Sequence, residues 1–140
     1  MQCTLDWQGP DGMLFVSRTG SGHVLAMDGA PDGGGQNLAP RPMETLLSGA
    51  GGCAAYDVVL ILKRGRHRLT GCRVTLTAER AEHDPKVFTQ IHYAFQLTGH
   101  ALPRPAVERA VQLSHEKYCS AIAMLEKTAE ISHSVEIIDA

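Results

Sequence analysis

The stretch PMETLLSGAGGCAAYDVVLIL, residues 42–62, decides the fold that this sequence predicts. Pro42 suits the first turn of a helix, because a helix start leaves its N–H groups unpaired anyway, and Glu44 complements the positive end of the helix dipole. Apolar residues occupy nearly every face as far as Leu62, so such a helix must be buried on most sides. We predict one long central helix, capped by Gly65 after two basic residues.

Glycines interrupt the apolar pattern between Gly49 and Gly52. Each costs roughly 1 kcal/mol against alanine in a helix, a penalty that is explained if another backbone or a partner subunit packs closely there. The alternative is a break between two helices at Gly49–Gly52, and the sequence leaves both interpretations open.

Upstream of this helix the pattern is that of strands. Short apolar runs over residues 3–7, 15–19 and 24–27 are separated by glycine and proline, which predicts a three-stranded meander. Residues 28–40 carry three consecutive glycines and little apolar area, so we expect a mobile loop there.

Downstream, apolar and polar residues alternate over residues 72–79 and 91–97, which predicts a hairpin around a turn at 83–86. Pro103 and Pro105 begin a second helix that reaches Ser114. A short helix over residues 120–127 and a strand over 133–139, with Val135 and Ile137 inward, follow. This order predicts a single α+β domain, residues 1–140, with mainly antiparallel sheets around the central helix.

Composition excludes several classes of protein. The chain has 44% hydrophobic residues, typical of a globular core, and a formal net charge of −2. That charge creates no field to attract nucleic acid or anionic lipid. The N-terminus lacks a signal peptide, and no apolar run approaches the roughly 20 residues of a membrane span. We therefore expect a cytoplasmic protein that binds neither nucleic acid nor membrane.

Four cysteines in an intracellular chain are more often reduced, catalytic or buried than paired in a disulfide framework. Cys3 and Cys72 lie on the apolar phase of predicted strands, so we interpret them as packing residues. Cys53 and Cys119 lie 66 residues apart in stretches of unusual composition. They can meet only through the tertiary fold.

Several motifs together resemble the OsmC/Ohr family, most closely its OsmC-like branch, over essentially the whole chain. They are Ser21-Gly22-His23, Met27-Asp28-Gly29, the run from Pro42 to Leu47, Gly51-Gly52-Cys53, and Glu116-Lys117-Tyr118-Cys119-Ser120. The resemblance implies a small α+β protein that forms an intertwined homodimer with active sites at the subunit interface. It also implies a thiol peroxidase that reduces organic hydroperoxides in oxidative-stress defence, with hydrogen peroxide as a second candidate substrate.

The resemblance assigns roles to two of the thiols. Cys53 takes the position of the peroxidatic cysteine, which attacks the O–O bond as a thiolate and becomes a sulfenic acid. Cys119 is the resolving candidate that closes a disulfide before overoxidation, and an external thiol or dithiol resets the enzyme. The cycle requires no metal, flavin or nicotinamide.

The supporting residues depart from the family pattern. Its peroxidases carry an acidic residue ten positions before the peroxidatic cysteine, paired with an arginine, but here that position is Met43. Glu44 is one residue away, which rotates its side chain by about 100°. Arg18 is our candidate for the activating arginine, with Arg41 as the alternative.

Other polar residues leave alternatives open. His115 lies four residues before Cys119 and would share its face if the helix continued that far, where it could lower the thiol pKa or bind metal. A zinc site of Cys53, Cys119 and His115 is one such alternative. Asp57, one turn after Cys53, is unusual in an apolar helix; we expect it to bond backbone or cross a dimer interface. Because Met43 replaces the carboxylate, a non-catalytic, redox-sensing or small-molecule-binding dimer is the second functional hypothesis.

Overall fold

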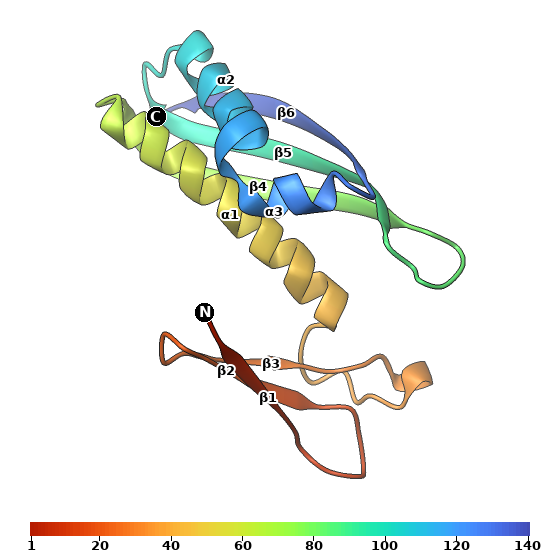
Figure 1. Cartoon of the computed structure of the whole chain (residues 1–140). Helices are drawn as coiled ribbons and strands as arrows, with labels where there is room; N and C mark the ends of the chain where they lie inside the picture. Colours follow the sequence, from red (N-terminus) through yellow and green to blue (C-terminus); the bar gives the residue numbers. More distant parts are fainter. The chain divides into compact units, whose positions relative to one another are not determined.

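The computed structural model describes all 140 residues, and the chain forms two compact units, Met1–Leu47 and Ser48–Ala140 (Figure 1). The first unit holds strands β1 to β3, and the second holds strands β4 to β6 with their helices. Helix α1, Pro42–Arg64, begins in the first unit and continues into the second.

The N-terminal unit contains the predicted meander. Strands β1 (Cys3–Trp7), β2 (Phe15–Thr19) and β3 (Val24–Met27) pair antiparallel in chain order. Every residue of β1 is exposed, including Cys3, whose predicted packing role is therefore wrong within this chain. The alternation was identified correctly, but an alternating strand is buried only where another layer covers it.

The segment after β3 folds around the carboxylate of Asp28, a residue that is only 2% exposed. Asp28 accepts the backbone N–H groups of Gly29, Gln36 and Leu38 at 2.7, 3.2 and 3.0 Å. These bonds lower the pKa of Asp28, the Leu38 N–H most strongly, while desolvation opposes them. The expected loop thus contains an organised turn with the short helix η1, Pro31–Gly33, because one buried carboxylate gathers three orphan donors.

Helix α1 is continuous through its glycines, so the alternative of a break at Gly49–Gly52 is wrong. A Cβ at Gly51 would lie 2.6 Å from a methyl group of Leu76, whereas nothing lies within 4 Å of one at Gly49 or Gly52. The buried residues form one stripe: Ala50, Gly51, Ala54, Val58 and Leu62. Within one chain, the expected burial on most sides is therefore wrong.

The C-terminal end of α1 differs from the prediction in one residue. The left-handed position is Arg66, with φ of 59°, and not Gly65. Arg66 and His67 donate their N–H groups to the carbonyls of Lys63 and Leu62, the paired bonds that close a helix in this way.

The second sheet contains the predicted hairpin, β4 (Arg68–Arg80) and β5 (Phe88–His100), each longer than expected. The mainly antiparallel pairing is confirmed, and the one exception is strand β6 (Glu130–Asp139), which pairs with β5 in parallel. The two strands can be parallel because a long helical connection carries the chain back across the sheet before β6 begins. This connection consists of α2 (Arg104–Leu113), η2 (Ser114–Tyr118) and α3 (Ser120–Leu125).

Helices α1, α2 and α3 lie on one face of this sheet (Figure 1). The core consists of the helix-facing residues of β5, above all Ile91, Tyr93, Phe95 and Leu97, packed with Val107, Ala110 and Val111 of α2. Val135 and Ile137 of β6 pair with Phe95 and Leu97, so their inward orientation is confirmed.

By length and composition alone, the 23-residue α1 could span a membrane, with a mean hydropathy of 1.6 over its most apolar window, contrary to the expectation that no such run exists. Its contact with the sheet through Gly51 and the buried stripe is typical of a core helix instead. Only 28% of that window is buried, so much of the apolar surface of α1 remains uncovered.

Candidate active site

The C-terminal unit brings Cys53 and Cys119 together. Their sulfurs and a carboxylate oxygen of Asp57 all lie within 4.8 Å of one another. Cys53 and Asp57 stand one turn apart on α1, which places both on the side facing the α2–α3 connection. Two distant segments thus supply one three-residue site.

The backbone around Cys119 explains why its thiol enters this site. Helix α2 widens into the π-helical turn η2, and Cys119 donates its N–H to the Ser114 carbonyl at 2.9 Å. Cys119 itself is extended, with φ −74° and ψ 101°, and its sulfur accepts the Ile122 N–H at 3.5 Å. Because the chain leaves the helix here, His115 and Cys119 do not share one regular helical face.

Cys119 is 2% exposed, and burial raises the pKa of its thiol to about 11. The neighbouring Cys53 raises the pKa of Cys119 further, whereas the backbone N–H groups of Ile122 and Ala121 lower it. Cys119 therefore retains its proton at neutral pH. Cys53, which is only half-buried, is the more accessible sulfur.

Ser114 connects the carboxylate to the π turn. Its hydroxyl is buried and lies 3.3 Å from the carbonyl oxygen of Ala54 and 3.3 Å from Asp57 Oδ2. A hydroxyl has one proton to donate, so Asp57 shares it with a backbone acceptor. Asp57 is held weakly beside the two sulfurs and keeps free acceptor capacity.

Tyr93, on β5, supplies an unpaired hydroxyl. The residue is 1% exposed, and its Oη has no hydrogen-bond partner. Burial raises the pKa of Tyr93 to about 12, with smaller contributions from the charges of Cys119 and Cys53. A neutral donor therefore lies near both sulfurs without an acceptor, which is costly unless something occupies the site.

Arg18 and Glu44, the charged residues predicted to activate Cys53, belong to the N-terminal unit, Met1–Leu47. Arg18 Nη1 forms an exposed ion pair with Asp6 Oδ2 at 2.6 Å. Glu44 accepts the backbone N–H of Arg41 at 2.9 Å, as a carboxylate does in the first turn of a helix. Arg41 in turn donates to Asn37 Oδ1 at 2.8 Å. Each charge thus has a partner within Met1–Leu47.

The ligand set expected for zinc differs from the group that the fold gathers. Asp57, and not His115, joins the two cysteines within 4.8 Å. The His115 ring lies edge-on to the His133 ring, with centroids 5.6 Å apart. Burial first, and then the charges of His115 and His92, lower the pKa of His133.

Two hollows border the site within the C-terminal unit. Asp57 lines one of about 310 Å³ together with Arg64 and Tyr118. Cys119 lines another of about 380 Å³, between His115 and Glu126. One hollow thus borders the carboxylate and the other borders the buried Cys119 thiol.

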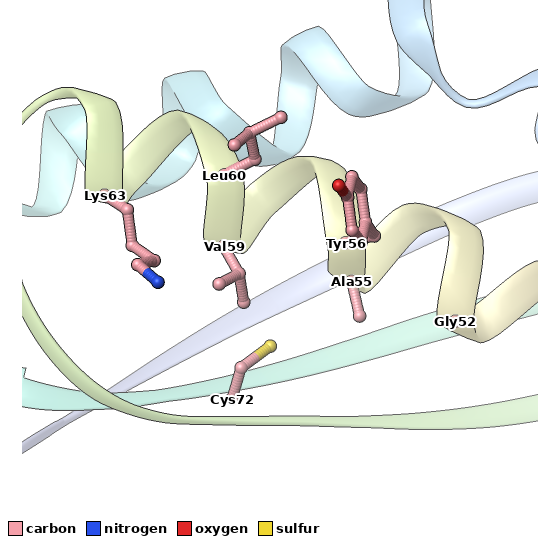
Figure 2. Close-up of a pocket in the computed structure, with 7 residues that line it drawn as sticks. All are labelled: Gly52, Ala55, Tyr56, Val59, Leu60, Lys63 and Cys72. Atoms are coloured by element: carbon pink, nitrogen blue, oxygen red, sulfur yellow. The ribbon is translucent and has the colours of Figure 1, made fainter.

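A third hollow, of about 430 Å³, lies on a different side of α1, above strand β4. Figure 2 shows the Cys72 thiol pointing toward the α1 side chains Ala55 and Val59, with Lys63 at one end. Burial raises the pKa of Cys72. This thiol is half-buried against aliphatic carbon, in keeping with its predicted packing role.

Sequence reasoning undervalued three residues of the site. Asp57 was expected to bond backbone or a partner subunit, while Ser114 was only the end of the predicted second helix and Tyr93 lay within a predicted strand. One signal was available, since a carboxylate four residues after Cys53 has no other reason to lie in an apolar helix. The positions of Ser114 and Tyr93 depend on how α2 and β5 pack.

Known proteins resemble this chain in sequence and in structure. A sequence model of the OsmC-like protein family matches residues 33–134. Protein YhfA of Escherichia coli K12 is 46% identical over 140 residues, all of both chains. A structural genomics structure is 45% identical and covers all of both chains with a TM-score of 0.89. An organic hydroperoxide resistance protein OsmC from Legionella pneumophila is 17% identical, covers 97% of each chain and has a TM-score of 0.67, a likeness of fold.

Proposed function

Because the chain belongs to the OsmC-like family, we propose that it is a thiol-dependent peroxidase that reduces organic hydroperoxides. The observation that carries this proposal is the separation of at most 4.8 Å between the Cys53 and Cys119 sulfurs, which come from distant segments. A small movement closes that distance to a disulfide bond of about 2 Å. The hydroperoxide-resistance relative from Legionella shares the fold and supports the same substrate class.

In the first step, the Cys53 thiolate attacks the outer oxygen of the hydroperoxide. The S–O bond forms as the O–O bond breaks, and the alkoxide leaves and takes up a proton to become an alcohol. Cys53 is oxidised to a sulfenic acid. Its greater exposure favours it as the nucleophile over Cys119, whose raised pKa keeps it a neutral thiol.

Tyr93 supports this step as a hydrogen-bond donor. Its hydroxyl is buried without a partner, and its raised pKa keeps it protonated. A peroxide or sulfenic oxygen would satisfy it, so ligand binding removes the penalty of the unpaired group.

In the second step Cys119 condenses with the Cys53 sulfenic acid to a disulfide, with loss of water. An external thiol or dithiol reduces the disulfide by exchange, so electrons enter from thiols, and we propose no metal or organic cofactor. Arg18 and Glu44 remain the candidates for an activating pair. The exposed Arg18–Asp6 ion pair is worth only about 0–1 kcal/mol, so Arg18 can exchange Asp6 for another anion.

We also propose that the protein works as a cytoplasmic homodimer. Helix α1 leaves an apolar side uncovered, where Tyr56 is 70% exposed beside the hollow shown in Figure 2. The N-terminal sheet likewise exposes Leu5, Trp7 and Val24. Apolar surface of this extent typically marks an interface.

The test adds one equivalent of cumene hydroperoxide to the reduced protein and counts free thiols. The wild type should lose the Cys53 and Cys119 thiols rapidly and regain both with a dithiol. Cys53→Ser should abolish the reaction, whereas Cys119→Ser should stop at a sulfenic acid that dimedone traps. The matched control Cys72→Ser should react like the wild type.

A redox-sensing dimer is the second candidate, favoured by Met43 at the position of the expected carboxylate. The same experiment separates the two functions. A sensor would form the disulfide once without catalytic turnover when a dithiol and excess hydroperoxide are present, whereas a peroxidase would consume hydroperoxide continuously.

A further inference from the structure

The resolving step of the proposed reaction faces a chemical difficulty. Cys119 must attack the Cys53 sulfenic acid through its sulfur, but burial holds its pKa near 11, so almost none is ionised at neutral pH. Hydroxide, the group displaced from the sulfenic sulfur, is a poor leaving group unless it is protonated. One group that moves the Cys119 proton to that oxygen would solve both problems.

We propose that Asp57 is this group: it relays the proton from Cys119 to the departing oxygen of the Cys53 sulfenic acid. The carboxylate lies within 4.8 Å of both sulfurs, so a small movement or one intervening water brings it within proton-transfer distance of the donor and the acceptor. This inference rests on the proposed peroxidase function and deepens it, because it assigns the second half of the cycle to a residue outside the thiol pair.

The step balances without another reactant. A lone pair of the Cys119 sulfur forms the S–S bond, the S–O bond of the sulfenic acid breaks, and its electron pair goes to oxygen. Asp57 accepts the thiol proton through one oxygen and delivers a proton to the leaving hydroxide, which becomes water. The Cys119 sulfur is oxidised, the sulfenic sulfur is reduced, and Asp57 ends as a carboxylate.

The surroundings of Asp57 suit a relay. Its one hydrogen-bond partner is the shared Ser114 hydroxyl at 3.3 Å, which orients the carboxylate without saturating it. Asp57 also lines the hollow of about 310 Å³, which gives the released water an exit. The titratable groups around Asp57 include Cys53 on the same helix, Arg64 at the hollow, and Tyr118 from η2. Those around Cys119 are Tyr93 from β5 and the residues that line its own hollow: His115, Glu116, Lys117, Tyr118 and Glu126.

The test measures the two half-reactions separately in the full-length protein. After one equivalent of cumene hydroperoxide, mass spectrometry with dimedone quenching follows the sulfenic acid and thiol counting follows the disulfide. In Asp57→Asn, sulfenic acid should form at the wild-type rate and then persist, because disulfide closure slows by about 10²- to 10⁴-fold, the usual contribution of a positioned proton-transfer group. Asp57→Glu should restore part of the rate.

The pH profile distinguishes a relay from a structural role. Without Asp57, closure must wait for ionised Cys119, so its rate in Asp57→Asn should rise about tenfold per pH unit toward about pH 11, while the wild-type rate should vary much less. If Asp57→Asn does not fold, Ser114→Ala replaces it in the test. This variant keeps the carboxylate but removes its anchor, so its rate of disulfide closure should be intermediate. Glu108→Gln, at an exposed carboxylate paired with Arg104, is the matched control and should behave as the wild type.

Two results would overturn the relay: disulfide closure in Asp57→Asn at the wild-type rate and pH profile, or loss of sulfenic acid formation in that variant. Failure of the proposed function is different, since the wild type itself would then form neither sulfenic acid nor disulfide.

Discussion

At the scale of single residues, the thiol site contains polar groups that a stable core would avoid. Asp57 lies on an apolar helix, Cys119 is a buried thiol within 4.8 Å of another thiol, and the Tyr93 hydroxyl has no partner. The Tyr93 hydroxyl costs free energy in the resting protein, because burial of a polar group without a partner is unfavourable. Their concentration around Cys53 is typical of a reactive site and not of a packing cluster.

Tyr93→Phe tests this trade-off between stability and function. Removal of a buried, unpaired hydroxyl should raise the free energy of unfolding by about 1 kcal/mol. The loss of one neutral donor should slow sulfenic acid formation by about fivefold. Urea denaturation of the reduced protein and single-turnover kinetics measure the two effects, and a destabilised variant with unchanged kinetics would contradict the role of the hydroxyl.

At the scale of elements, the segment between β3 and α1 shows how one side chain can order a glycine-rich stretch. Its composition alone indicated a mobile loop, yet three backbone N–H groups converge on Asp28. Gly35 completes the turn, because a Cβ there would overlap the backbone of Gly29. Composition averages over residues and therefore misses a single buried carboxylate.

This arrangement predicts an acid-sensitive segment. The pKa of Asp28 is lowered below its ordinary value of 3.8, so the folded protein binds fewer protons here than the unfolded chain. The resulting stabilisation is complete above that value and is lost as pH falls through the lower, folded pKa. Amide hydrogen exchange at Leu38 should therefore lose protection as the pH falls below 3.8 and through the lower pKa of folded Asp28.

Asp28→Asn should remove most of that pH dependence and lower protection already at neutral pH, because the amide cannot match a carboxylate as acceptor of three N–H bonds. Asp32→Asn, at an exposed carboxylate of the same segment, is the control. Equal acid sensitivity in the wild type and Asp28→Asn would refute the assignment.

At the scale of the whole molecule, α1 presents three different sides. One stripe is buried on the sheet, a second carries Cys53 and Asp57, and a third exposes apolar residues around Tyr56. An all-round apolar helix needs cover on most sides, and the single chain leaves the third side uncovered. A second copy of the chain is the partner that we propose for the third side.

Sedimentation velocity should therefore show twice the mass of the chain. Tyr56→Glu should shift the protein to the monomer, because a charge buried without a partner costs several kcal/mol. Tyr56→Phe, which keeps the aromatic ring, should remain dimeric. A wild-type protein that sediments as a monomer at all concentrations would exclude this interface.

The sequence by itself determined the local elements. Pro42 and the run to Leu62 specified α1, alternation specified the hairpin of β4 and β5, and the spacing of punctuating glycines specified the meander. These features depend on backbone and periodicity rules that act over a few residues. The same local logic erred at Gly65, where the left-handed residue is Arg66, because either neighbour can close the helix.

Only the tertiary structure decided what lies beside Cys53. The parallel pairing of β6, the π turn that redirects Cys119, and the convergence of Asp57, Ser114 and Tyr93 all depend on how α2 and α3 cross the sheet. No periodicity encodes contacts between residues about 60 positions apart, since these arise from the packing of whole faces. The sequence therefore identified the two thiols, and the fold brought the carboxylate and the hydroxyls to the distances that the proposed chemistry requires.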